Sequence, residues 1–130
     1  MNMKSEDQRV TTFFTFFGQA EEAMNFYTSL FEQSEIKQVK HNSDGTVLQA
    51  LFTVQGQTFM CSDSPPVHDW SFTPAVSLFI ECESEEEIQR LFDSLTVDGK
   101  IHMPLDNYGF SRKFGWVDDK FGVSWQLNFV

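Results

Sequence analysis

The chain has 130 residues, 41% of them hydrophobic, which is enough for one domain with a proper core. Its 19 acidic and 9 basic residues give a formal net charge of −10, which argues against nucleic acid and against anionic membrane surfaces as partners. No run of about 18 apolar residues could span a membrane, and residues 1–9 lack the apolar core of a signal peptide. We therefore expect a cytoplasmic protein with a disordered arm at 1–9.

The first half of the chain predicts a strand, a helix and three further strands. Residues 10–17 are rich in Thr and Phe, which is typical of a strand. From Ala20 to Phe31 the apolar residues recur with the spacing of a helix that buries one face. Three strand-like segments follow, separated by turn residues: 35–40, 46–54 and 57–62.

The second half repeats this order after a segment at 64–74 that holds three of the four prolines. Residues 75–82 alternate as a half-buried strand. Ser84 and Glu87 form a capping box before a helical stripe that ends at Leu95. Strand candidates then lie at 100–103, 110–117 and 123–129.

The two predicted helices align at one constant offset and suggest an internal repeat. At this offset four positions are identical: Glu21 and Glu86, Glu22 and Glu87, Ser29 and Ser94, Leu30 and Leu95. We predict a single domain at 10–130, with module one at 10–63, a connection at 64–74 and module two at 75–130. Each module alone is too small to bury its helix and both sheet faces, so we expect a shared core.

Several segments resemble a known family: residues 18–23 with 26–27, 60–64, 98–101 and, most specifically, 114–126. On these segments the chain resembles the vicinal oxygen chelate superfamily, which includes glyoxalase I, bleomycin-resistance proteins and extradiol dioxygenases. Within it, the chain is similar to the PhnB-like branch, which carries the name 3-demethylubiquinone-9 3-methyltransferase domain. The resemblance implies an α+β glyoxalase/bleomycin-resistance-like fold, in which two tandem βαβββ modules form a curved mixed sheet around a cavity. It also implies a homodimer.

The residues give no support for methyl transfer. The seven glycines form no glycine-rich turn between a strand and a helix, of the kind that holds a nucleotide-type cofactor. No serine stands in a G-x-S-x-G elbow, and Cys61 and Cys82, which we expect to be buried free thiols, lack an electropositive sequence neighbourhood. The sequence leaves catalysis open and favours a protein that is not an enzyme.

The resemblance also predicts where a metal would bind. In metal-dependent relatives each module supplies a His or Gln from its first strand and a Glu from its last. Here the first-strand position falls at Thr11 or Thr12 in module one and near Ser77 in module two. The final-strand position falls near residues 60–63 in module one, where only Asp63 is a carboxylate, and at Gln126 in module two. Uncharged hydroxyl and amide groups are poor ligands for a divalent transition metal, so we expect no metal and no other cofactor. Secondary metal candidates are His68, His102 and Asp63.

The final strand alternates, which predicts that Ser124, Gln126 and Asn128 face the cavity. We expect a cavity that is polar but uncharged and has aromatic walls. The predicted ligand-binding residues are Thr12, Phe14, Ser77, Phe79, Trp116 and Gln126. Glu81 could be a catalytic base or a residue of the rim. The aromatic residues could equally do no more than pack in the core.

These observations leave three hypotheses. The first is a small-molecule binding protein of the PhnB-like branch, without the usual metal, that holds an aromatic or amphipathic organic ligand between its modules. The second is a metal-dependent lyase, isomerase or dioxygenase with nonstandard ligands. The third is a structural or interaction domain whose cavity is filled by side chains.

Overall fold

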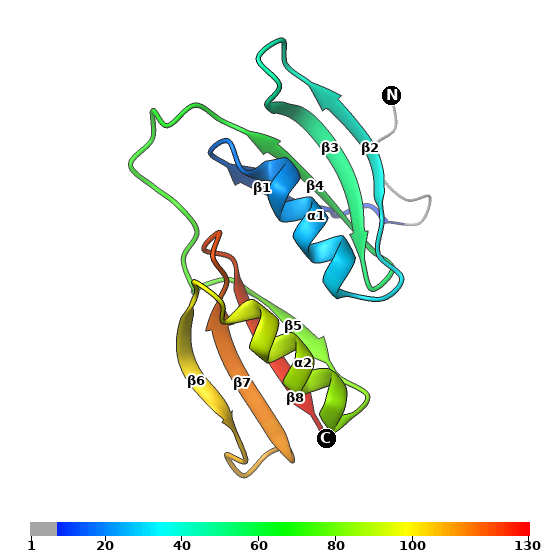
Figure 1. Cartoon of the computed structure of the whole chain (residues 1–130), viewed down its shortest axis with the longest axis vertical. Helices are drawn as coiled ribbons and strands as arrows, with labels where there is room; N and C mark the ends of the chain where they lie inside the picture. The colour runs from blue at the N-terminus through cyan, green and yellow to red at the C-terminus, as the bar shows by residue number, and fades with distance from the viewer. Residues whose placement is uncertain (1–7) are drawn as a thin grey trace. The chain divides into compact units, whose positions relative to one another are not determined.

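The computed structural model describes residues 8–130, so most of the arm expected at 1–9 lies outside the described residues. The chain forms two compact units that meet in sequence between Asp69 and Trp70, within the predicted connection (Figure 1). Each unit has one helix and one mixed four-stranded sheet, which confirms the predicted α+β fold of two βαβββ modules. None of the described helices is long and apolar enough to cross a membrane.

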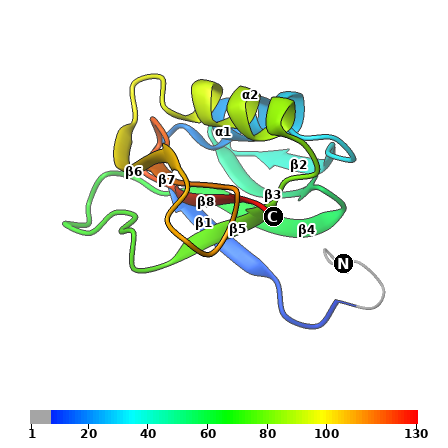
Figure 2. The ribbon, with the colours of Figure 1, turned by 90° about the horizontal axis from the view of Figure 1, so that it is seen from below.

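Unit 1 follows the predicted order of elements: β1 (Thr12–Phe16), α1 (Ala20–Leu30), β2 (Ile36–His41), β3 (Val47–Val54) and β4 (Gln57–Asp63). The strand order is β1-β4-β3-β2, with β1 parallel to β4 and the other neighbours antiparallel. The helix connects β1 to β2, which are the two edge strands of the same sheet. It covers one face of that sheet (Figure 2).

The core of unit 1 is an aromatic layer between the sheet and α1. Phe14 of β1 lies 5.6 Å from Phe59 of β4 between ring centroids, and Phe59 lies 5.6 Å from Phe52 of β3. Tyr27 of the helix stacks on Phe52 at 6.4 Å. Much of the unusual phenylalanine content of the first half thus fills the core, where each buried ring contributes a large apolar area.

Unit 2 repeats the arrangement with β5 (Ser77–Glu81), α2 (Glu85–Leu95), β6 (Lys100–Asp106), β7 (Lys113–Asp118) and β8 (Ser124–Phe129). The strand order is β5-β8-β7-β6, again with a parallel first pair. β6 runs past Pro104, beyond the predicted end at 103, with irregular pairing to β7. This edge position suits a proline, because the residue has no N–H to donate to a neighbouring strand.

The predicted capping box at α2 is present in a shifted form. The Ser84 hydroxyl accepts a hydrogen bond from the Glu87 N–H at 3.0 Å. The Glu87 carboxylate in return accepts from the N–H of Glu83 at 2.7 Å, one residue before the cap itself. Two backbone donors at the start of the helix are therefore satisfied by side chains of its own sequence.

The turn between β7 and β8 is built on one buried aspartate. Oδ1 of Asp119 accepts hydrogen bonds from the backbone N–H groups of Phe121 and Val123 at 2.8 and 3.1 Å. Oδ2 accepts from the indole N–H of Trp125 at 2.8 Å. Asp119 thus connects the turn to Trp125, the most deeply buried aromatic residue of the unit.

The difference in residue number between equivalent positions of the two units, which we call the offset, is not the same for the helices as for two of the strands. α1 and α2 have the same length, and their offset carries Ala20 to Glu85 and Leu30 to Leu95. In the last strands, however, Cys61 of β4 corresponds to Leu127 of β8. Both are fully buried under the helix of their unit, and each stands opposite a residue of the first strand on that same face. The helix offset would instead carry Cys61 to Gln126, one position earlier. Counted between equivalent positions, the loop before the helix and the loop before the last strand therefore differ in length between the units, by one residue each.

Candidate functional site

Each sheet has one face under its own helix and one face turned away from it, which we call the open face. In unit 2 the covered face is marked by Gly115, where an added Cβ would lie 2.8 Å from the Phe92 ring of α2. Gly115 pairs with Leu127, so Leu127 is on the covered face and its neighbours Gln126 and Asn128 are on the open face. This confirms the predicted alternation of the final strand.

The open face of unit 2 carries three rows of side chains across β5, β8 and β7. Residues that pair across neighbouring strands lie on the same face, so the register defines the rows. The rows are Ser77, Ser124 and Asp118; then Phe79, Gln126 and Trp116; then Glu81, Asn128 and Phe114. The structure thus brings together Ser77, Phe79, Glu81, Trp116 and Gln126, all of which the sequence singled out.

Polar side chains of these rows are joined by hydrogen bonds. The Gln126 amide Nε2 donates to the Ser77 hydroxyl at 2.8 Å. The Asn128 amide Nδ2 donates to Oε2 of Glu81 at 3.2 Å, and its oxygen accepts from the hydroxyl of Ser111. These contacts fix the amide orientations and leave Glu81 exposed at the margin of the face.

Aromatic rings extend over the same face. Phe79 is 52% exposed, and its ring centroid lies 6.4 Å from that of Phe114. Phe110 is 60% exposed and packs edge-on against Phe114 at 5.1 Å, and Tyr108 packs on Phe114 at 6.2 Å in the same manner. An exposed aromatic group of this kind offers flat surfaces on which another ring can stack.

His102, Asp118 and Trp116 form a second group on this face. Nε2 of His102 lies 2.8 Å from Oδ2 of Asp118, and both side chains are largely buried, at 18% and 16% exposure. The His102 ring packs against that of Trp116 at 4.8 Å, and the Trp116 indole N–H donates to the Ser124 hydroxyl at 2.8 Å. The pairing of His102 with Asp118 was missed at the sequence level, because it depends on the irregular register between β6 and β7.

In unit 1 the expected orientation of β1 was wrong. Thr12 and Phe14 were expected on the face that lines the cavity. β1 pairs in parallel with β4 so that Phe14 stands opposite the buried Cys61, and Phe14 is itself 8% exposed within the aromatic core. Thr12 shares its face by alternation. The open-face row of this unit is instead Phe13, Met60 and Leu51, and Phe13 is 47% exposed.

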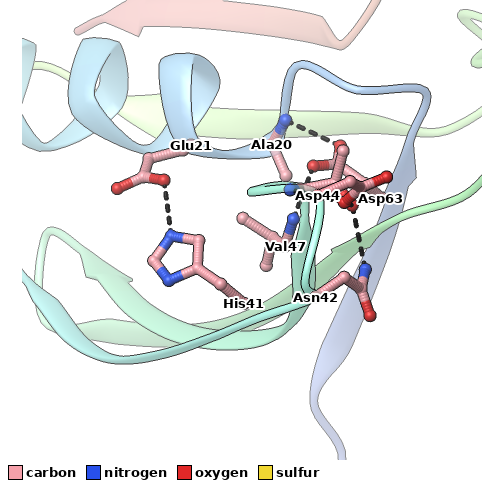
Figure 3. Close-up of polar contacts among 8 residues, drawn as sticks. Ala20, Glu21, His41, Asn42, Asp44, Val47 and Asp63 are labelled. Atoms are coloured by element: carbon pink, nitrogen blue, oxygen red, sulfur yellow. Dashed lines mark hydrogen bonds and ion pairs between the residues drawn. The ribbon is translucent and has the colours of Figure 1, made fainter.

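Asp63 has a structural role (Figure 3). Its Oδ1 accepts hydrogen bonds from the backbone N–H groups of Gly18 and Ala20, and its Oδ2 accepts from that of Val47, each at 2.9 Å. The side chain of Gln19, at the start of α1, makes no capping hydrogen bond, so Asp63 from β4 satisfies the first turn of the helix instead. This arrangement gives no support to Asp63 as a metal ligand.

A hollow of about 330 Å³ lies beside Asp63, in the region of the β2–β3 turn. Asp44 on its rim accepts hydrogen bonds from both the N–H and the hydroxyl of Thr46, which hold the pKa of the Asp44 carboxyl below its usual value. On the surface nearby, Nε2 of His41 lies 2.7 Å from Oε1 of Glu21. His68 lies in the connection, with its ring 6.4 Å from that of Phe17, which lines the hollow.

The residues at the expected metal positions do not fit a divalent ion. Ser77 already accepts a hydrogen bond from Gln126, and the residue of unit 1 that corresponds to Gln126 is Met60, because each pairs with the exposed phenylalanine of the first strand. Hydroxyl, amide and thioether groups carry no charge to offset that of the ion. Within residues 8–130 no three His, Cys, Asp or Glu side chains are grouped so that they could hold a metal.

The two cysteines are buried and unpaired, as expected. Burial raises the pKa of the Cys61 thiol to about 12, and the nearby Asp63 carboxylate acts in the same direction. Burial likewise raises the pKa of Cys82 to about 12, with Glu87 adding to the effect. Both thiols are therefore protonated near neutral pH and are poor nucleophiles.

The fold of two repeated mixed sheets is also found in solved proteins of low sequence identity. A glyoxylase/bleomycin resistance protein/dioxygenase domain from Frankia sp. EAN1pec superposes with a TM-score of 0.68, covering 96% of this chain and 93% of that one, at 12% identity. More specifically, residues 8–128 match the model of the family described as 3-demethylubiquinone-9 3-methyltransferase. The chain belongs to this family.

Two relatives are closer in sequence. The structure of a PhnB protein from Bacillus cereus is 55% identical, covers 95% of this chain and 100% of its own, and superposes with a TM-score of 0.92. Protein YjdN from Escherichia coli strain K12 is 34% identical over 87 residues, which make up 67% of this chain and 58% of YjdN. The Bacillus cereus protein supports the predicted PhnB-like branch. The match to YjdN spans little more than half the length of that protein.

Proposed function

We propose that this chain is a small-molecule binding protein that holds a neutral or positively charged aromatic ligand on the open face of unit 2, without a metal ion. The observation that carries the proposal is the exposed aromatic group around Phe114, which lies beside the hydrogen-bonded side chains of Gln126 and Ser77. Phe79 is 52% exposed and Phe110 is 60% exposed, and both rings contact Phe114 of this face. Aromatic rings supply the stacking surface, and fixed amide and hydroxyl groups supply orientation.

The charge of the face favours neutral or cationic ligands over anions. Its rows contain the carboxylates of Glu81 and Asp118, and Lys100 faces Asp118 from β6. The whole chain carries a formal charge of −10, which raises the local concentration of cations near its surface.

The name of the family describes a methyl transfer, and the superfamily includes metal-dependent enzymes. Neither activity is part of this proposal. The uncharged donor set at Ser77, Gln126 and Met60 does not favour a metal-dependent lyase, isomerase or dioxygenase. We further propose a homodimer, as the resemblance implies, which light scattering of the eluting protein would test.

The test uses 1-naphthalenemethanol, an aromatic probe without charge. A ligand of about 12 heavy atoms that contributes roughly 0.45 kcal/mol per atom would bind with a Kd on the order of 0.1 mM. Titration followed by ¹H–¹⁵N correlation spectra should shift the amide signals of β5 and β7. Phe79→Ala and Phe110→Ala should each weaken binding severalfold, because they remove stacking surface.

A matched control is Val97→Ala, which truncates an exposed apolar residue in the turn after α2. It should leave the affinity unchanged. Absence of any shift on the open face, or equal losses in the control and the two phenylalanine variants, would contradict the proposal. Stoichiometric metal in the purified protein, found by elemental analysis and needed for binding, would contradict its metal-free part.

A further inference from the structure

The open face of unit 2 holds an oriented imidazole. His102 projects from β6 and Asp118 from β7, and Nε2 of His102 lies 2.8 Å from Oδ2 of Asp118. The Trp116 ring packs on one side of the imidazole at 4.8 Å between centroids. A carboxylate beside one ring nitrogen and an aromatic ring against one face leave the histidine little freedom to rotate.

The two ring nitrogens of His102 are in different environments. Nε2 is buried, and although it is within ion-pair distance of Asp118, it has no well-directed hydrogen bond; Oδ1 of Asp118 is also buried and without a hydrogen bond. Nδ1 is not among these buried atoms, and no group of residues 8–130 bonds to it. It is the ring nitrogen that a ligand on the open face can reach.

The adjacent carboxylate determines what Nδ1 can bind. With Nε2 protonated, the positive end of the N–H bond lies close to the Asp118 carboxylate, although it is not aligned with it; with only Nδ1 protonated, two acceptor atoms, Nε2 and Oδ2, would stand 2.8 Å apart. The first tautomer is favoured, and in it Nδ1 is a hydrogen-bond acceptor. Because the carboxylate is largely buried, its charge is screened less than that of a surface residue, and it strengthens the attraction of Nδ1 for a positively charged donor.

We infer that the His102–Asp118 pair selects ligands with a protonated amine attached to the aromatic ring system, the ammonium donating to Nδ1 of His102. This inference rests on the proposed function and specifies the ligand class of that site. The middle row of Phe79, Gln126 and Trp116 lies beside the pair, so a ring over this row places a short alkylammonium arm near His102. Glu81 lies in the third row, on the other side of the middle row from Asp118.

The test compares 1-naphthylmethylamine, which is a cation at neutral pH, with the matched 1-naphthalenemethanol. The ring is the same in both probes, so the ratio of the two affinities measures recognition of the ammonium group. The wild-type chain should bind the amine about tenfold more tightly, as expected for one charge-assisted hydrogen bond at a partly exposed site. His102→Phe and Asp118→Asn should each reduce this ratio to near one and retain the affinity for the alcohol.

Three controls keep the outcome interpretable. Asp93→Asn removes a carboxylate from the outer surface of α2 and should leave the ratio unchanged. Glu81→Gln should lower the ratio far less than Asp118→Asn, and the reverse result would overturn the inference. If His102→Phe weakens both probes equally, the pair is merely structural and the inference fails. Binding of the alcohol with no preference for the amine would refute the inference alone, whereas binding of neither probe would refute the proposed function.

Discussion

Asp119 provides the strictest test of how the sequence stabilises unit 2. Its carboxylate is buried and accepts three hydrogen bonds, two from backbone N–H groups of the β7–β8 turn and one from the indole of Trp125. A hydrogen bond to a charged acceptor contributes about 1.5–3 kcal/mol, but three that share one carboxylate are not additive. We expect Asp119→Ala to lower the free energy of unfolding by about 3–5 kcal/mol.

Asp119→Asn separates the roles of the two oxygens. The amide oxygen can still accept from the two backbone groups, but the amide NH₂ then opposes the indole N–H of Trp125, so one donor remains unsatisfied. A loss of about 1–3 kcal/mol is expected, smaller than that of the alanine variant.

Urea unfolding followed by far-UV circular dichroism would measure both losses, with Trp fluorescence as a second probe of the same transition. Asp93→Ala, which truncates an exposed carboxylate of α2, serves as the control and should change stability by less than about 0.5 kcal/mol. A loss below about 1 kcal/mol for Asp119→Ala would show that the turn does not depend on this carboxylate.

Three other outcomes follow from the described contacts. Gly115→Ala should lower stability by about 1–3 kcal/mol in the same urea assay, because its Cβ would lie 2.8 Å from the Phe92 ring. Asp63→Asn should cost about 1–2 kcal/mol and increase hydrogen exchange of the Val47 amide, because the amide oxygen can still accept from Gly18 and Ala20 but the amide nitrogen cannot accept from Val47. Cys61 and Cys82, with pKa values raised to about 12, should stay protonated at pH 8 and react with a thiol reagent only after urea unfolds the chain; rapid modification of the native protein would contradict this.

The order of elements followed from local patterns. Helical spacing, the Ser84 cap and the turn residues predicted both helices and all eight strands within a few residues. The final strand alternates cleanly between polar and apolar residues, so its open face could also be predicted. The alternation of the final strand accounts for Gln126, and the alternation of residues 75–82 accounts for Ser77 and Phe79.

The orientation of β1 could not be obtained in this way. Phenylalanine stands at 13, 14, 16 and 17, so both faces of the strand look apolar and alternation gives no answer. Only the pairing with β4 places Phe14 in the core and Phe13 on the open face. Likewise, the capping role of Asp63 and the contact between His102 and Asp118 join residues from separate elements, which no local pattern reports.

The helices of the two units align at one offset in residue number, and two of the strands align at another. This difference limits how the two units can be compared or recombined. Because side chains of a strand alternate, a difference of one residue in a loop exchanges the buried and the open positions of the whole strand. Aligning the units throughout at the offset of the helices matches Phe14 with Phe79, a core ring with an exposed one. A segment exchanged between the halves would keep its faces only if its flanking loop moved with it, so the strand together with its loop is the interchangeable part of this duplicated chain.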